Sequence, residues 1–394
     1  MSTITRKKTI ILVSPNSQYG VSQYFVIDLS AELKKLGFNV LIVSPTVFNK
    51  KLTTFLADST LYFIFGMNGW GFESLSKHIL NKTLNVPFIA YLLDHPLYHS
   101  NRIDFNISSN RFIVSCVDLN HLKDLETFFK GNFQTAFIPQ GAKLPSNLLK
   151  NRLPMEKRPI PLLFAGSYMD ENLYRKEWNN HILSKVFDEI SERAIYQNKD
   201  SVLLTANQVF AEKGLPFGIP EDKVLIYYLN QIDLFIRAKR RREVLETVAP
   251  LNITIYNEKW SYLKKLGALV KPSINYAELL RILSQTKITL NILPNYVYGG
   301  HERIFNSLLS GSVCFSDRNE FLDNNFQNKR EILLYNLNNT KMITDTLTYY
   351  LNQNNLLANI VRNGQQKVMK EHTWRQRAKT LLKEVGKNYT LPIQ

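Results

Sequence analysis

The sequence predicts an α/β protein of two successive domains, each built around a mainly parallel sheet. Short apolar runs rich in β-branched and aromatic residues alternate with amphipathic helical stretches, which is typical of layered α/β proteins. This alternation stops in a proline-rich stretch at 139–161 and then starts again, which indicates a linker. The length of 394 residues is also that of two ordinary domains.

The first domain is expected to span residues 1–150. Its clearest helix covers 21–36, where apolar residues recur at helical spacing. Gly37 follows, a residue type that commonly ends helices. With the apolar runs on either side, this helix forms a strand–helix–strand unit over 9–44. The runs interpreted as strands of this domain are 9–14, 39–44, 60–65, 87–93, 111–116 and 135–138.

The second domain is expected to span residues 151–375. It opens with a strand at 162–167 that ends in the small residues Gly166 and Ser167, and a long helical region follows at 172–248. Further strands are predicted at 252–256, 268–270, 288–292, 312–316 and 331–335, helices at 276–285 and 302–310, and a helical tail at about 341–388. Open α/β sheets bind ligands at the carboxyl ends of their strands, and two such domains facing each other form a cleft suited to a ligand.

The composition bounds the partners without choosing among them. The 49 Lys and Arg residues exceed the 33 Asp and Glu residues, which gives a formal charge of +16. A basic protein attracts nucleic acid, an anionic membrane surface or a phosphorylated ligand. The basic run of Arg237, Lys239, Arg240, Arg241 and Arg242 has helical spacing with apolar neighbours. We interpret it as a solvated helix face, with membrane attraction as the second interpretation.

Cysteine content and hydropathy point to a cytoplasmic protein. The two cysteines, Cys116 and Cys314, both lie in apolar runs, which excludes a disulfide framework and a cysteine-based zinc site. No apolar stretch reaches the roughly 18–20 residues that span a bilayer. The apolar run after Arg6-Lys7-Lys8 is too short for a signal peptide. Association with the cytoplasmic face of a membrane stays open.

Two stretches of the first domain carry candidate functional residues. The loop at 14–22 follows the first strand, and Gly20 in it lets a backbone approach a ligand at a helix start. It lacks the glycine spacing of a dinucleotide site, and an ordinary loop is the alternative interpretation. The second stretch holds Asp94, His95 and His99 just after a strand. Asp94 and His95 are candidate catalytic groups, unless Asp94 only caps a turn.

The third candidate stretch, 296–317, begins with Tyr298, Gly299, Gly300 and His301 ahead of a helix. The paired glycines and the helix start present N–H groups to a diphosphate. Glu302 and Asn306 share a helix face and suit ribose hydroxyls, and Arg303 suits phosphate charge. A helix with a capping acid is the alternative interpretation. No Asp-x-Asp motif follows a strand, so no tightly bound metal is implied.

Together these stretches resemble the GT-B glycosyltransferases, and most closely the group that includes family-4-like and spore-coat glycosyltransferase-like proteins. The resemblance implies two Rossmann-like domains facing across a cleft, with residues 376–394 as a helix returning toward the first domain. Its most specific matches are Leu162–Ser167, Ile253–Trp260, Lys271–Leu280, Glu302–Asp317 and His372–Ala378.

The resemblance also implies donor-binding residues, namely Gly20, Gly166, Ser273, Tyr298, Gly299, Gly300, His301, Glu302, Arg303 and Asn306. The chain departs from the family in two ways. Asn306 stands where family-4 enzymes usually place a second glutamate. The usual arginine–lysine pair on the phosphates has no clean counterpart, and Arg175 and Lys176 are the nearest substitutes.

The implied activity is transfer of a sugar from a nucleoside diphosphate sugar to an acceptor hydroxyl, without metal or cofactor. The expected acceptor is a glycan, a lipid-linked molecule or a protein, and nucleic acid is not expected. Asp94, or failing that His95, is the expected base of an inverting reaction, and a retaining reaction needs none. A nucleotide-sugar epimerase, a phosphorylase of the same fold and an inactive binding protein remain as alternatives.

Overall fold

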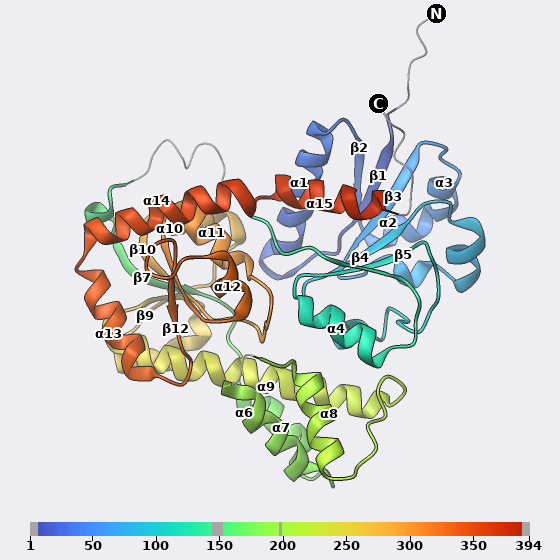
Figure 1. Cartoon of the computed structure of the whole chain (residues 1–394). Coiled ribbons are helices and arrows are strands. Elements are labelled where there is room, and N and C mark those ends of the chain that lie inside the picture. Colours follow the sequence, from blue (N-terminus) through green and yellow to red (C-terminus); the bar gives the residue numbers. More distant parts are fainter. Residues whose placement is uncertain (1–6, 144–152, 197–198, 388–394) are drawn as a thin grey trace, which may run out of the picture. The chain divides into compact units, whose positions relative to one another are not determined.

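The computed structural model describes residues 7–143, 153–196 and 199–387 (Figure 1). The chain divides into two compact units. Unit 1 consists of Met1–Gly141 and Thr373–Gln394, and unit 2 consists of Ala142–His372. The α/β class predicted from the sequence is confirmed, because each unit is built on one six-stranded sheet.

The expected domain borders at 150 and 375 differ from the divisions of the structure, which fall after Gly141 and His372. Part of the expected linker, 144–152, lies outside the described residues, as does 388–394 of the expected C-terminal helix.

Unit 1 has a parallel sheet in the order β2-β1-β3-β4-β5-β6. The four central strands are buried along their whole length, which explains why they read as continuous apolar runs. The strands are β1 (Thr9–Val13), β2 (Asn39–Val43), β3 (Leu61–Met67), β4 (Phe88–Leu92), β5 (Phe112–Cys116) and β6 (Gln134–Phe137), and the helices from the N-terminal part are α1 (Val21–Lys35), α2 (Pro45–Lys50), α3 (Leu52–Leu56) and α4 (Leu119–Phe128).

The last described helix, α15 (Trp374–Gly386), belongs to unit 1. Its Trp374 ring lies 5.3 Å from the Phe25 ring of α1, and Nε of Arg377 donates to the carbonyl oxygen of Gln140. The chain therefore completes its first unit with residues from its C-terminal part.

Unit 2 has a parallel sheet in the order β12-β11-β10-β7-β8-β9. The order reverses between β7 and β10, and ligands of open α/β sheets bind at the carboxyl ends of strands beside such a reversal. The strands are β7 (Ile160–Ala165), β8 (Thr254–Tyr256), β9 (Leu269–Lys271), β10 (Thr286–Asn291), β11 (Val313–Asp317) and β12 (Leu333–Tyr335).

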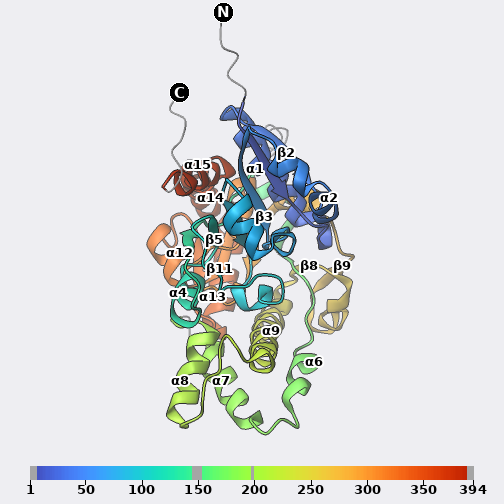
Figure 2. The ribbon, with the colours of Figure 1, turned by 90° about the vertical axis from the view of Figure 1, so that its right-hand side faces the viewer.

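The helical region predicted at 172–248 consists of separate helices. The longest of them, α9, lies between the sheet of unit 2 and α6, α7 and α8, as Figures 1 and 2 both show. The helices of unit 2 are α6 (Glu171–Arg175), α7 (Ser184–Tyr196), α8 (Val202–Glu212), α9 (Lys223–Val248), α10 (Tyr276–Leu283), α11 (Glu302–Ser310), α12 (Glu320–Asn325), α13 (Thr340–Leu351) and α14 (Asn354–Glu371).

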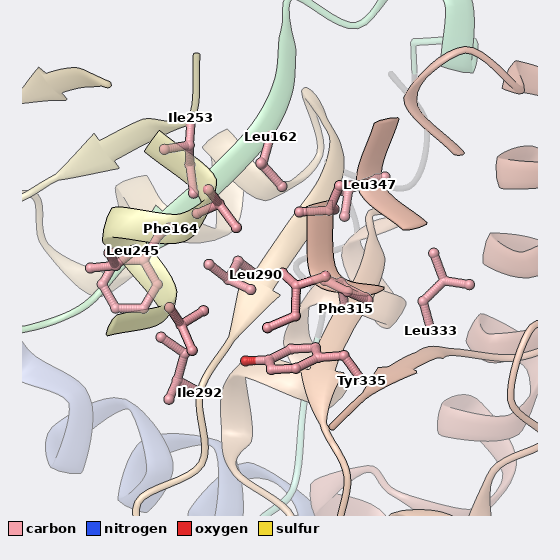
Figure 3. Close-up of a cluster of buried hydrophobic side chains, with 14 of the residues drawn as sticks. Leu162, Phe164, Leu245, Ile253, Leu290, Ile292, Phe315, Leu333, Tyr335 and Leu347 are labelled. Atoms are coloured by element: carbon pink, nitrogen blue, oxygen red, sulfur yellow. The ribbon is translucent and has the colours of Figure 1, made fainter. Parts of the chain in front are cut away.

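A hydrophobic core holds α9 and α13 against this sheet (Figure 3). Leu245 of α9 packs on Phe164 of β7, and Leu347 of α13 packs near Phe315 of β11. These side chains are fully buried, and each contributes roughly 1.5–3 kcal/mol relative to an exposed side chain. The core thus fixes α9 beside the strand ends that carry the candidate site.

Candidate active site

The carboxyl ends of β7 and β10 bring together Gly166 and Arg303, two residues predicted from the sequence. A Cβ atom added to Gly166 would stand 2.7 Å from Cζ of Phe164 and 3.5 Å from Nη2 of Arg303. A larger residue at this position would therefore push against the Phe164 ring and approach the guanidinium. Glycine keeps the turn after β7 open beside Arg303.

Arg303 is a buried cation in the first turn of α11. Its side chain is 7% exposed, its Nη1 donates to Oδ1 of Asn291 across 3.1 Å, and its Cζ lies 5.4 Å from the centre of the Phe164 ring. Nε of Arg303 has no hydrogen-bond partner, and no described residue forms an ion pair with this side chain. Burial lowers the pKa of Arg303, although the charge of Glu302 opposes this effect.

A second cation reaches the same turn from α9. Nη1 of Arg241 donates to the carbonyl oxygen of Ser167 across 3.1 Å and contacts Sδ of Met169. Burial, together with the charges of Arg303 and Arg237, lowers the pKa of Arg241 to about 9. Arg241 too lacks an ion-pair partner among the residues of known placement. The turn after β7 therefore lies beside two arginines that repel each other.

The interpretation of 237–242 as a solvated helix face is wrong for its inward residues. Arg237 is 9% exposed and its Nε lies 2.7 Å from Oδ2 of Asp233. Arg240 is 3% exposed and donates from Nε and Nη2 to the last carbonyl groups of α7. Lys239, Arg241 and Arg242 are half-buried, and Arg242 forms ion pairs with Glu171 and Glu246.

The start of α11 holds an imidazole–carboxylate contact. Nδ1 of His301 lies 2.9 Å from Oε2 of Glu302 and 3.3 Å from the backbone N of Arg303. Burial raises the pKa of Glu302, but contacts with His301 and Arg303 outweigh it, so the pKa lies below the ordinary value. Burial lowers the pKa of His301, although the charge of Glu302 opposes this effect. The site thus pairs an ionised carboxylate with a neutral imidazole at neutral pH.

The paired glycines before α11 are packed rather than open. A Cβ atom on Gly300 would stand 2.5 Å from Cζ of Phe305 and 2.8 Å from Cε1 of Phe321. The carbonyl oxygen of Gly299 accepts a hydrogen bond from Nδ2 of Asn319. The ring of Tyr298 packs edge-on against Phe321. Close packing already requires glycine at position 300, whether or not a phosphate binds there.

Asn306 and Ser273 are both held by protein partners. Asn306 is 3% exposed, and its Nδ2 donates to the hydroxyl of Tyr276 across 2.8 Å. This amide joins α11 to α10, while its Oδ1 is buried without a hydrogen-bond partner among the described residues. The backbone N and Oγ of Ser273 both donate to Oε2 of Glu258, which fixes the loop after β9.

Arg175 and Lys176, the proposed phosphate ligands, do not join this cluster in the structure. Nη2 of Arg175 lies 2.8 Å from Oδ2 of Asp188, and its Nη1 donates to Oδ1 of Asn179. Lys176 is exposed. Since the charge of Arg175 is already paired, Arg241 is the better-placed cation.

In unit 1, the loop at 14–22 closes on itself. Oγ of Ser17 donates to Oε1 of Gln23 and accepts from the backbone N of Ser22. Tyr19 and Gly20 are both left-handed, with φ angles of 61° and 74°. A left-handed tyrosine is strained, and such strain concentrates at functional loops. Gly20 serves as the N-cap of α1.

His95 is not available as a base. Its Nδ1 accepts from the backbone N of Leu97 at 3.2 Å, and its Nε2 lies 2.9 Å from Oδ2 of Asp124. These two contacts use both ring nitrogens, with the proton on Nε2 facing the carboxylate. The expected alternative base is therefore a structural residue in this conformation. Burial lowers the pKa of the neighbouring His99 to about 4, against the charge of Asp94, so His99 is neutral at pH 7.

The same sheet edge carries residues that the sequence did not single out. Arg102 stacks 3.8 Å from the centre of the Trp70 ring, and its Nη1 donates to the carbonyl oxygen of Asn68. Oδ1 of Asn68 accepts from the backbone N of Leu93, next to Asp94. The half-buried Asp94 thus follows a strand end whose loops are cross-linked.

A hollow elsewhere in unit 2 is a poor match for a diphosphate. It measures about 580 Å³ and is lined by Tyr196, Glu243, Glu246, Thr247, Leu337, Asn338 and Thr340. Its two glutamates repel an anion.

Within the described ranges, no group of three His, Cys, Asp or Glu side chains is arranged to hold a metal ion. No helix among them has the length and apolar character to cross a membrane.

Comparison with known proteins agrees with this geometry. Residues 237–383 match the family described as glycosyl transferase-like, a stretch that includes Arg237, Arg241, Glu302 and Arg303. No curated protein matches the sequence.

Three solved structures have a similar fold over 96% of this chain. Sucrose-phosphate synthase from Thermosynechococcus elongatus has a TM-score of 0.57 at 10% identity, with 98% of its own chain covered. An alpha-glucosyltransferase in complex with UDP-glucose and DNA containing an abasic site has a TM-score of 0.56 at 10% identity, with 99% covered. HepE from Anabaena, in complex with UDP and glucose, has a TM-score of 0.50 at 11% identity, with 100% covered.

At these identities the structural likeness establishes the fold alone. The resemblance found in the sequence is confirmed at that level and by the family match. The chain has the two Rossmann-like units of the GT-B fold, and its residues 237–383 match the family described as glycosyl transferase-like.

Proposed function

We propose that the chain transfers a sugar from a nucleoside diphosphate sugar to an acceptor hydroxyl. The observation that carries the proposal is the pair Arg241 and Arg303 beside the turn after β7. Arg303 is buried and Arg241 is half-buried, and neither forms an ion pair within the described structure. Buried like charges without counterions are costly. A bound diphosphate would offset that cost and hold the departing group.

The rest of the donor is assigned to neighbouring residues. The ionised Glu302 suits the hydroxyls of a ribose, since a carboxylate accepts hydrogen bonds from both. As negative charge develops on the leaving diphosphate, the two guanidinium groups and the N-terminus of α11 would stabilise it without a metal ion. Two of the similar structures contain UDP or UDP-glucose, which makes UDP the first nucleotide to test.

Acceptor binding is assigned to unit 1. The strained loop at Tyr19–Gly20, the loop at Asn68 and the half-buried Asp94 all follow strands of its sheet. Asp94 is the proposed base if the reaction inverts configuration, and no side-chain base is required if it retains configuration. A glycan, a lipid-linked molecule and a protein all remain acceptor classes of this proposal.

The first experiment measures thermal stabilisation of the purified chain by a panel of nucleoside diphosphates and their nucleosides. A ligand that binds only the folded state raises the melting temperature in proportion to its affinity. We expect at least one nucleoside diphosphate to stabilise the chain, while its nucleoside does so less. The proposal fails if no nucleoside diphosphate raises the melting temperature.

A second experiment separates an enzyme from an inactive binding protein. The stabilising nucleotide is supplied as its sugar conjugate, and release of free sugar or transfer to an added acceptor is followed with and without EDTA. Turnover that survives EDTA supports metal-independent transfer. Nucleotide affinity without turnover favours a binding protein, and a changed sugar on an intact nucleotide favours an epimerase.

A further inference from the structure

The helices α7, α8 and α9 of unit 2 enclose a small hollow, which we call the apolar hollow. It measures about 200 Å³, several times the roughly 30 Å³ that a water molecule occupies in the liquid, so it has room for one aliphatic side chain. α7 and α8 lie across α9 from the sheet of unit 2 (Figures 1 and 2), and no residue of the donor cluster lines the hollow. Its lining is mainly aliphatic and aromatic and includes Leu183, Phe187, Phe210, Leu215, Val224 and Leu225.

An isoleucine projects into solvent at the rim of this hollow. Ile182 is 94% exposed, the highest value of any large apolar side chain in the described ranges. It lies between His181 and Leu183, which both line the hollow. The turn is fixed, because Nδ1 of His181 accepts from the backbone N of Leu183 and the His181 ring stacks with Phe187. Ile182 is therefore held outward by a well-anchored turn.

Another part of the rim is apolar as well. Val224, in the first turn of α9, lines the hollow and is 62% exposed. Tyr227 follows one helical turn later on the same face of α9 and is 45% exposed. Single exposed apolar residues are ordinary, but an apolar hollow flanked by several of them marks an interaction surface.

We propose that this surface pairs with a second copy of the chain about a two-fold axis, so that Ile182 of each copy enters the apolar hollow of the other. A two-fold interface uses the same surface on both copies, and a projection beside a hollow of suitable size allows such a surface to fit itself. The anchored turn reduces the ordering cost of association. This inference concerns α7, α8 and α9 and does not depend on the donor site.

Charge supports a second copy as the occupant. The segment 176–185, which carries Ile182, holds two lysines and one glutamate, so its formal charge is +1. The segment 221–224, which reaches the hollow, holds Glu221, Asp222 and one lysine, so its formal charge is −1. When Ile182 enters the partner's hollow, the first segment of each copy meets the second segment of the other, and their charges are opposite. Although the whole chain carries +16, two copies can thus meet here without local repulsion.

The experiment is analytical ultracentrifugation of the full chain over a range of concentrations. We expect the wild type to sediment as a dimer that dissociates on dilution. Ile182→Glu should raise the dissociation constant at least about a hundredfold, because each dimer contains the substitution twice and each copy would bring a carboxylate to an apolar hollow. Val224→Glu should weaken the dimer in the same direction. The matched control Met369→Glu changes the charge equally at a 46% exposed apolar residue of α14 in the same unit and should dimerise like the wild type.

Reversal of the two charges tests the crosswise contact of the segments. Lys185→Glu makes 176–185 negative, and Glu221→Lys makes 221–224 positive, so each single variant should dimerise more weakly, most clearly at low salt. The double variant carries opposite charges again and should recover much of the lost affinity. A double variant that dimerises more weakly than both single variants would contradict this arrangement.

Sedimentation as a monomer at every concentration would overturn the inference and leave a different protein as the occupant of this surface. Equal dimerisation of Ile182→Glu and the wild type, or an equal loss in Met369→Glu, would overturn it too. The melting temperature of each variant identifies those that are folded, and Val224→Glu keeps the test valid if Ile182→Glu is not. Because dimerisation is measured without nucleotide, its result and that of the donor-site proposal are judged separately.

Discussion

Nη1 of Arg303 donates to Oδ1 of Asn291 across 3.1 Å, which ties the first turn of α11 to the carboxyl end of β10. Nδ2 of Asn291 donates to Oγ of Ser316, so the amide oxygen is the atom that faces the guanidinium. An amide is neutral, and this contact therefore orients Arg303 without cancelling its charge. The orientation leaves the positive charge available to an anion beside Gly166.

The substitution Asn291→Asp tests this relationship with almost no change in shape. It gives Arg303 a carboxylate partner and adds negative charge where a diphosphate would bind. We expect UDP, or whichever nucleoside diphosphate stabilises the chain, to bind about tenfold more weakly or worse, since a charged hydrogen bond contributes about 1.5–3 kcal/mol. Calorimetric titration measures the change. Unchanged affinity would show that Arg303 does not meet the diphosphate.

Arg241 and Arg242 provide a matched pair on one helix. Arg241→Met keeps the length of the side chain but removes the cation next to Ser167, so diphosphate affinity should fall about ten- to a hundredfold. Affinity for the nucleoside should not change, because it carries no phosphate. Arg242→Met removes a charge that already pairs with Glu171 and Glu246 and should leave both affinities unaltered.

The free Arg241→Met protein is expected to be at least as stable as the wild type. Burial and the charges of two neighbouring arginines oppose the cation at position 241, so its removal costs the unliganded fold little. Thermal melting with and without nucleotide checks this. A large loss of stability in the free variant would instead assign Arg241 a structural role through Ser167.

Much of the fold could be predicted because most of its strands are buried parallel strands. Every strand of the described ranges overlaps an apolar run found in the sequence. Strands covered on both faces have no polar alternation and so stand out from amphipathic helices. Predicting the helices of 172–248 was harder. The turn before α9 was signalled by its glycines and prolines, Gly214, Pro216, Gly218 and Pro220, but long polar faces obscured it.

The arginines of α9 show why the site was only partly predictable. A run of charged residues normally marks a solvated face, and nothing local in the sequence reveals a buried partner. Arg240 is buried because it donates to the carbonyl groups that end α7, and a helix C-terminus attracts cations. Those carbonyl groups come from more than forty positions earlier. The available signal was spacing, since Arg237 and Arg240 continue the inward stripe of Leu229, Ile236 and Val244.

Asp317, at the carboxyl end of β11, predicts a pH effect on stability. Burial raises the pKa of its carboxyl to about 6, although the backbone N–H of Leu293 and the charge of Arg240 lower it. In the unfolded chain this pKa is about 3.9. The folded state thus holds the proton more tightly, so the contribution of Asp317 to stability is fully present below about pH 4 and is lost as pH rises through 6.

The variant Asp317→Asn removes this titration while keeping an oxygen to accept from Leu293. Relative to the wild type, the variant should be similar near pH 4 and more stable by about 1–3 kcal/mol at pH 7–8. Urea unfolding at several pH values measures the difference. A stability difference that does not vary with pH would contradict the assignment to Asp317.

His95 and Asp94 are adjacent in the sequence but should respond differently to substitution. His95→Ala leaves the buried carboxylate of Asp124 without its imidazole partner and removes the cap on the backbone N of Leu97, so the free energy of unfolding should fall by about 2–4 kcal/mol.

Asp94→Asn keeps the size and polarity of the side chain, and the melting temperature of this variant should stay near that of the wild type. If Asp94 is the base of an inverting transfer, turnover should fall at least about a hundredfold while nucleotide affinity is unchanged. A stable His95→Ala protein would return His95 to the candidate bases, and wild-type turnover by Asp94→Asn would leave a retaining reaction as the better account.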